Sequence, residues 1–198
     1  DGYRVHMQES GGAQSAVEAR WLVNAAGLHA DRVAESVGID VDACGYRLYP
    51  NRGHYFRVSA TRSKLVSRLI YPIPPRHQAG LGIHVTIDRA GQCRLGPDTE
   101  YCDRSVPMEQ WYRFDESRQE QFYRAASRYF PALVPDDLSP DQVGVRPKLQ
   151  PPGGVTRDFV IAEESGRGFP GFINLIGIES PGLTCAHEIG VEVARMIR

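Results

Sequence analysis

The chain has 198 residues, of which 41% are hydrophobic, and its formal net charge at pH 7 is −1. This length is enough for one large domain or two smaller ones, and the composition is that of a soluble globular protein. The arginines are scattered rather than clustered, so a nucleic-acid partner is not expected. No apolar run approaches the roughly 20 residues that a membrane-spanning helix needs, so no membrane span is expected either.

The cysteines and the first residues indicate the setting of the chain. There are four cysteines, and they lack both CxxC spacing and a histidine at metal-ligand intervals. This pattern favours free thiols in a reducing cytoplasm and predicts no metal site. The chain begins at Asp1 within an apparent strand and without an initiating Met, which suggests a piece of a longer protein.

The first forty residues predict a hairpin followed by a strand and a helix. Residues 3–8 alternate apolar and polar side chains, as a half-buried strand does, and residues 15–20 can return beside them. Residues 21–27 are an apolar strand that ends in small residues. A helix is expected over 29–37, ending at Gly38.

The middle of the chain has a different pattern. Residues 46–96 are strand-like and broken by glycine and proline, which predicts an antiparallel sheet with a hairpin turn at 88–92. The strand expected at 69–75 contains three prolines and should lie at an edge or end early. A helix is predicted from Asp115 to Tyr129, then a connector over 131–141, then strands at 144–149 and 158–162.

The last thirty residues repeat the strand, turn and helix of the N-terminal part. Residues 172–178 are nearly all apolar, as in a strand buried on both faces of a parallel sheet, and a helix is expected over 183–197. A glycine turn between them aims backbone N–H groups and the positive end of a helix dipole at an electron-rich ligand. By itself the local pattern better suits an ordinary strand-to-helix connection that ends a domain. Two such segments favour a layered α/β arrangement that binds ligands at the carboxyl ends of its strands.

Taken in order, eight short motifs resemble the FAD-dependent oxidoreductases of the D-amino-acid-oxidase superfamily, and within it the branch of L-2-hydroxyglutarate dehydrogenase-like proteins. They are Val23–Asp31, Arg52–Tyr55, Tyr71–Pro74, Leu81–Thr86, Leu95–Pro97, Gly144–Lys148, Asp158–Ile161 and Gly177–Thr184. The resemblance implies a mixed α+β and α/β fold. It consists of an incomplete FAD/NAD(P)-binding, Rossmann-like domain (residues 1–44 and 166–198) and an antiparallel-sheet substrate-binding domain with a flanking helix (45–165).

Members of this superfamily open with a strand and a G-x-G-x-x-G turn that holds the FAD pyrophosphate. This glycine pattern is absent from the chain. The resemblance therefore implies that the chain is the C-terminal part of a longer FAD enzyme. Whether the chain alone binds FAD stays open.

The resemblance also assigns candidate catalytic residues. Arg146 matches the position that clamps the substrate carboxylate, a task that suits the guanidinium fork; the alternative is a surface arginine paired with Asp158 or a neighbouring residue. Lys148 shares its face of the strand and could bind a second carboxylate or simply be solvated. His84 could act as the base, since histidine has an ordinary pKa of about 6.5, or could make a structural hydrogen bond. His54 is a weaker candidate for the same role.

Candidate cofactor-binding residues lie in three places. The C-terminal turn would offer N–H groups to the flavin, and its glycine would permit close approach. The small residues after the first apolar strand would pack beside the dinucleotide, and the start of the long central strand would approach the flavin. The candidates are Ala26, Gly27, Arg52, Gly53, Pro181, Gly182, Leu183 and Thr184.

These expectations lead to one main hypothesis and two alternatives. The main hypothesis is oxidation of a small 2-hydroxy acid, with L-2-hydroxyglutarate as the leading candidate, by hydride transfer to FAD. The first alternative is an amino-acid or amine oxidase of the same superfamily, because Arg146 would serve either carboxylate. The second is a ligand-binding fragment without catalysis. A homodimer through the exposed flavin-domain face is also expected.

Overall fold

The computed structural model describes residues 2–73 and 82–197. The chain forms two compact units: a terminal unit of residues 1–49 and 146–198, and a central unit of residues 50–145. The functional division expected from the sequence, with boundaries at 44/45 and 165/166, stays a prediction. The structural units differ from it in that residues 146–165 belong with the two ends of the chain.

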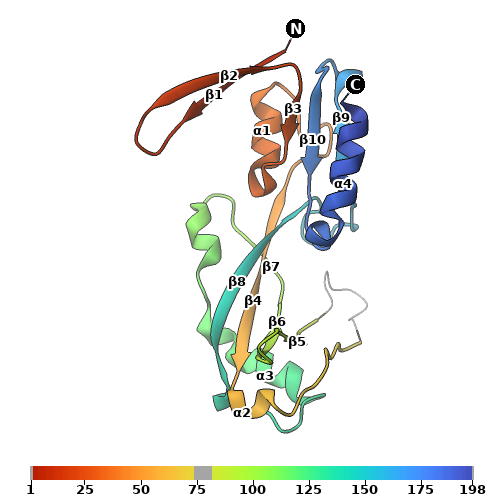
Figure 1. Ribbon diagram of the computed structural model, residues 1–198. Helices are drawn as coiled ribbons and strands as arrows, with labels where there is room; N and C mark the ends of the chain where they lie inside the picture. The colour runs from red at the N-terminus through yellow and green to blue at the C-terminus, as the bar shows by residue number, and fades with distance from the viewer. Residues whose placement is uncertain (1, 74–81, 198) are drawn as a thin grey trace. The chain divides into compact units, whose positions relative to one another are not determined.

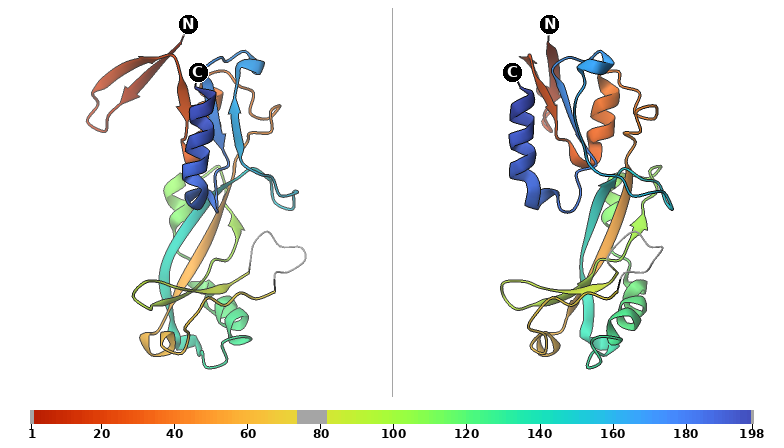
Figure 2. Two further views of the ribbon diagram at one scale, coloured as in Figure 1. Left: turned by 45° about the vertical axis from the view of Figure 1, so that its right-hand side comes forward. Right: turned by 90° about the vertical axis from the view of Figure 1, so that its right-hand side faces the viewer.

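A three-stranded sheet forms the middle of the terminal unit. Strand β10 (Phe172–Ile176) lies between β3 (Leu22–Asn24), which runs parallel to it, and β9 (Val160–Glu163), which runs antiparallel. The helices α1 (Ala30–Ser36) and α4 (Gly182–Met196) flank this sheet on opposite faces (Figures 1 and 2). The Rossmann-like layering and the two strand–turn–helix segments expected from the sequence are therefore confirmed.

The core of the terminal unit lies between α1 and the sheet. Small residues of the helix, Ala30 and Ala34, allow close packing against Phe172 and Ile176 of β10. The chain leaves α1 at Gly38, whose positive φ of 100° ends the helix as expected. The remaining buried apolar members of this cluster are Ile39, Val41, Tyr46, Leu48 and Leu149.

Two elements of the terminal unit are more exposed than their patterns predict. The hairpin of β1 (Tyr3–Gln8) and β2 (Gln14–Ala19) forms with Val5 opposite Val17, yet Val17 is 52% exposed. The predicted apolar stripe of α4 is only half-buried at Ile189 and Val193, and Leu183 is 93% exposed. This leaves apolar surface open, while self-association stays a prediction.

The central unit contains the antiparallel sheet that the sequence predicts. The long strand β4 (Tyr49–Val58) pairs with β6 (Cys93–Gly96), β7 (Glu100–Tyr101) and β8 (Leu138–Lys148), and β5 (His84–Ile87) pairs with β6. The turn at 88–92 is confirmed by hydrogen bonds between Asp88 and Gln92. The helices here are α2 (Ala60–Ser63), η2 (Met108–Tyr112), η3 (Glu116–Arg118), α3 (Gln119–Ser127) and η4 (Pro135–Asp137); η1 (Gly27–His29) and η5 (Ser165–Arg167) belong to the terminal unit. In the described ranges no helix is long and apolar enough to cross a membrane.

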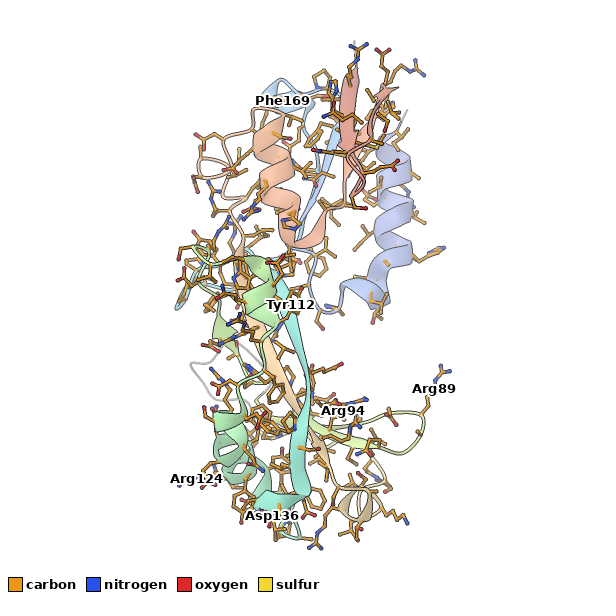
Figure 3. All side chains as sticks on the ribbon, turned by 90° about the vertical axis from the view of Figure 1, so that its left-hand side faces the viewer. Arg89, Arg94, Tyr112, Arg124, Asp136 and Phe169 are labelled. Atoms are coloured by element: carbon orange, nitrogen blue, oxygen red, sulfur yellow. The ribbon has the colours of Figure 1, made fainter. Side chains whose placement is uncertain are left out.

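The prediction of a connector over 131–141 is wrong at its end, because β8 begins at Leu138. Its aspartates are used by the sheet: Asp141 accepts from Arg57 of β4 at 2.6 Å and from Arg94 of β6 at 2.5 Å (Arg94 is labelled in Figure 3). Such ion pairs between strands stabilise β8 in the sheet, although the composition of its first residues suggests a connector. The strand expected at 69–75 is reduced to a single bridge between Ile70 and Val85, and Pro74 and Pro75 lie outside the described residues.

Substitution of Phe122 tests the packing of the core of the central unit. Its ring is fully buried and lies 4.7 Å from that of Phe56, measured between ring centroids. Phe122→Ala should lower the free energy of unfolding by about 3–5 kcal/mol, because the cavity cannot fully collapse. Tyr112→Ala, at a side chain that is 45% exposed, is the control and should cost less than about 1 kcal/mol. The free energies of unfolding are measured by urea denaturation, and an equal decrease in the two variants would contradict this packing.

Candidate functional site

The two strand–turn–helix segments of the terminal unit meet at one edge of the sheet. Strands β3 and β10 are parallel neighbours, with Asn24 opposite Asn174, so the turns that follow them leave from the same carboxyl edge. In parallel sheets this edge is where ligands bind. The turn with Ala26 and Gly27 and the turn that leads to Pro181, Gly182, Leu183 and Thr184 therefore leave the sheet at the same edge.

Buried amide groups fix the first turn. The Asn24 side chain donates to the Ala30 carbonyl at 2.7 Å and to Asn174 Oδ1 at 2.8 Å, and its own oxygen accepts from the Ala26 N–H at 3.4 Å. Gly27 adopts a φ of 58°, and a Cβ there would meet open space. Its N–H has no hydrogen-bond partner in the part of the chain that the structure describes. The first turn thus leaves a donor available beside an uncrowded backbone.

The second turn is packed tightly where it leaves β10. A Cβ at Gly177 would lie 2.5 Å from Leu149 Cδ1, and a Cβ at Gly182 would lie 2.6 Å from Ile178 Cγ2, so both positions require glycine. The N–H of Gly182 donates to Glu179 and that of Thr184 donates to Pro181. Of the three N–H groups expected to face the flavin, only that of Leu183 has no acceptor among the described residues. It lies in the first turn of α4, at the positive end of the helix dipole.

Lys148 holds the second turn through an ion pair. Its Nζ lies 2.9 Å from Glu179 Oε1, and the two side chains are only 8% and 14% exposed. Glu179 was not among the residues expected at the site, and a single glutamate in a turn carries no sequence signal for a partner 31 residues away. The role of Lys148 toward a second carboxylate stays a prediction, but its charge is already balanced by Glu179.

Arg146 lies on β8 in the same unit and is half-buried. Asp158, its alternative partner in the sequence analysis, accepts a hydrogen bond from the Phe159 N–H at 2.8 Å. No ion pair joins Asp158 to Arg146 in the described ranges. The assignment of Arg146 to a substrate carboxylate stays a prediction.

The remaining candidates belong to the central unit. His84 is buried, its ring stacks on Tyr71 at 4.5 Å, and its Nδ1 lies 2.9 Å from the Gly82 carbonyl. Since a carbonyl only accepts, Nδ1 is the donor in this hydrogen bond, which fixes the orientation of the ring. Arg52 pairs with Glu100 through Nε at 2.7 Å, and Gly53 is buried beside it on β4.

A fully buried carboxylate, that of Glu164, supports the asparagine pair next to the first turn. Glu164 accepts from Asn174 Nδ2 at 2.8 Å and from Arg167 at 3.0 Å. Tyr46 also hydrogen-bonds to it, and burial together with this carboxylate raises the pKa of Tyr46 to about 12. The Tyr46 hydroxyl therefore stays protonated at neutral pH, and these hydrogen bonds suit a structural support for the edge.

Comparison with known proteins identifies the family of the chain. The family model described as "FAD dependent oxidoreductase" (DAO) matches residues 1–196. The chain belongs to this family of FAD-dependent oxidoreductases. Similar relatives include the mitochondrial L-2-hydroxyglutarate dehydrogenase of Arabidopsis thaliana, 39% identical over 87% of the chain and 36% of that protein. The L-2-hydroxyglutarate dehydrogenase of Escherichia coli K12 is 26% identical over 91% of the chain and 48% of that protein. The chain thus spans between about a third and a half of these relatives.

Solved structures of the family show the same fold at low sequence identity. The L-alpha-glycerophosphate oxidase of Mycoplasma pneumoniae, determined with FAD bound, has a TM-score of 0.72 at 22% identity, covering 96% of the chain and 48% of that structure. The glycine oxidase of Geobacillus kaustophilus has a TM-score of 0.67 at 17% identity, covering 97% of the chain and 44% of that structure. These likenesses confirm the predicted fold class.

The carboxyl edge of the terminal unit fits part of a flavin. The ring system of FAD presents carbonyl oxygens and ring nitrogens, which accept hydrogen bonds. The N–H groups of Gly27 and Leu183 are donors without acceptors among the described residues, and the glycines keep side chains away from the backbone. The pyrophosphate has no comparable support here, because the glycine loop that binds it is absent from the sequence.

The Lys148–Glu179 ion pair gives a test of how the second turn is held. Lys148→Met leaves the largely covered carboxylate of Glu179 unpaired and should lower the free energy of unfolding by about 3 kcal/mol. In Lys148→Met/Glu179→Gln the unpaired charge is gone, so much of this loss should be recovered. The control is the exposed pair Arg124–Glu120, whose arginine points outward from α3 in Figure 3; its removal should cost less than about 1 kcal/mol. Additive losses in a urea double-mutant cycle would show that the two side chains are not coupled.

Proposed function

We propose that the chain is the C-terminal part of an FAD-dependent dehydrogenase or oxidase that oxidises a small 2-hydroxy acid, with L-2-hydroxyglutarate as the leading candidate. The observation that carries the proposal is the match of residues 1–196 to the FAD-dependent oxidoreductase family. The 39% identity to the L-2-hydroxyglutarate dehydrogenase of Arabidopsis supports the choice of substrate. When bound, the flavin supplies the hydride acceptor for the carbon that carries the hydroxyl group.

The residues of this chain bind the flavin, orient the substrate and accept its proton. In this proposal the N–H groups of Gly27 and Leu183 donate to the flavin ring, and Arg146 binds the carboxylate next to the reacting carbon with two parallel N–H donors. His84 accepts the hydroxyl proton as the base, with its ring oriented by the hydrogen bond between Nδ1 and the Gly82 carbonyl. Lys148 keeps the second turn in place through Glu179.

An amino-acid or amine oxidase is the second candidate. The glycine oxidase of Geobacillus kaustophilus shares the fold, and an arginine that binds a carboxylate serves both substrate classes. A ligand-binding module without catalysis is the third candidate. The cytoplasmic location and the homodimer remain predictions of the sequence.

Anaerobic reduction of the flavin separates these candidates. The protein is purified as encoded, with any sequence that precedes residue 1, and mixed with L-2-hydroxyglutarate or with amino acids. Loss of the oxidised flavin absorbance near 450 nm with the hydroxy acid is the expected result. Bleaching only by an amine would replace the proposal with the oxidase. If the purified protein binds no flavin, the ligand-binding module without catalysis becomes the favoured candidate.

The carboxylate role of Arg146 can be measured in the same protein. Arg146→Lys loses the bidentate geometry while it keeps the charge, so KM for the hydroxy acid should rise about 10- to 100-fold. Arg4→Lys is the matched control, because Arg4 is exposed and paired with Glu18 on the hairpin. An unchanged KM in Arg146→Lys would remove this residue from the substrate site.

A further inference from the structure

Arg52 is an arginine whose anchoring leaves part of its guanidinium available. It lies on β4 with its side chain only 20% exposed, and its Nε donates to Glu100 Oε2 at 2.7 Å. Its two terminal amino groups make no hydrogen bond within residues 2–73 and 82–197. A guanidinium carries five N–H donors in a fixed plane, so four of them point to no protein acceptor in these ranges.

Arg118 fixes the carboxylate that anchors Arg52. It belongs to η3 and bridges two acidic residues of the facing segment: one amino group donates to Asp98 Oδ2 at 2.7 Å and the other donates to Glu100 Oε2. Its Nε donates to Asp115 Oδ2 at 3.2 Å. Because Glu100 Oε2 accepts from both arginines, the orientation of Arg52 depends directly on that of Arg118.

The buried end of this chain of ion pairs is His54 with Asp98. Asp98 Oδ1 accepts from the His54 backbone N–H at 2.7 Å and lies 3.0 Å from its Nδ1. Burial alone would raise the pKa of Asp98, but the hydrogen bonds from His54 and Arg118 outweigh it and hold the pKa below its ordinary value. His54 is fully buried, and its ring lies edge-on to that of Phe114 at 5.4 Å. Asp98 is thus a charged and immobile partner for Arg118.

The charges show why the terminal amino groups of Arg52 matter. Among the described residues three carboxylates, those of Asp98, Glu100 and Asp115, contact Arg118 or Arg52, and only Glu100 contacts both arginines. Arg52 engages Glu100 through Nε alone, so its two terminal amino groups are not used in this ion pair. The arrangement fixes the guanidinium and leaves its outer donors for another acceptor.

We propose that Arg118 is a positioning residue that, through Glu100, holds the terminal amino groups of Arg52 ready to donate to an electron-rich oxygen of a bound ligand. The inference rests on the proposed function for the source of that oxygen, which is either a flavin carbonyl or a substrate carboxylate. Both sources accept hydrogen bonds from a guanidinium. If the oxygen belongs to the flavin, loss of Arg52 weakens FAD binding; if it belongs to the substrate, loss of Arg52 weakens carboxylate binding.

The test compares Arg52→Lys, Arg118→Met and the double variant in the protein as encoded. The affinities measured by calorimetry are those for FAD and for glutarate, a dicarboxylate that cannot be oxidised at a hydroxyl group. Both single variants should weaken the same affinity at least tenfold: that for FAD if the oxygen is a flavin carbonyl, that for glutarate if it is a carboxylate. Arg124→Met, at an exposed position of α3, should change neither affinity.

The double variant decides whether Arg118 acts through Arg52. If it does, Arg118→Met has no further effect once Arg52 is lysine, whereas a merely structural role would add its effect in either background. Glu100→Gln, which keeps the shape of the anchor, is the second variant in case Arg118→Met does not fold, and should weaken the same affinity. Additive losses, or two unchanged affinities in Arg52→Lys, would overturn the proposal. Glutarate binding is measured without flavin reduction, so this result does not depend on which substrate the protein oxidises.

Discussion

The hydrogen bond between the side chains of Asn24 and Asn174 holds the candidate site together. It joins two parallel strands at their carboxyl edge, where both amides are buried. Each amide has further partners: Asn24 binds the Ala30 carbonyl that begins α1, and Asn174 donates to the buried carboxylate of Glu164. Since an unpaired buried amide costs about 1–3 kcal/mol, this network permits one register of the two strands. The two turns that follow are therefore held at one edge.

The second turn depends on a different kind of interaction. Glycine at 177 and 182 lets the backbone pass close to Leu149 and Ile178, and the Lys148–Glu179 pair anchors the turn to the end of β8. Hydrogen bonds within the turn use the N–H groups of Gly182 and Thr184, while that of Leu183 finds no acceptor among the described residues. A rigid turn with one uncommitted donor is suited to recognise one acceptor atom, because no donor has to be reoriented on binding.

Local patterns predicted most of the fold. The apolar run at 172–178 and the alternation in the hairpin each correspond to a strand, and the small residues after Asn24 correspond to the turn that follows β3. The extent of β8 was missed because its first residues look like a connector, and their aspartates are explained only by arginines on other strands. The candidate site was predicted to the level of its turns. Its supports were not, because Glu179, Asn174 and Arg118 act on partners 18 to 150 residues away.

The central claim is that the first turn of α4 binds the flavin through the N–H of Leu183, and proline at this position tests it most directly. Leu183→Pro removes this single donor, and proline is tolerated in the first turn of a helix, where no intrahelical hydrogen bond is lost. Leu183→Ala keeps the donor and removes the exposed side chain. The account predicts that the protein as encoded binds FAD about tenfold more weakly with proline than with alanine, at unchanged helix content by circular dichroism. Equal FAD affinities of the two variants would contradict it.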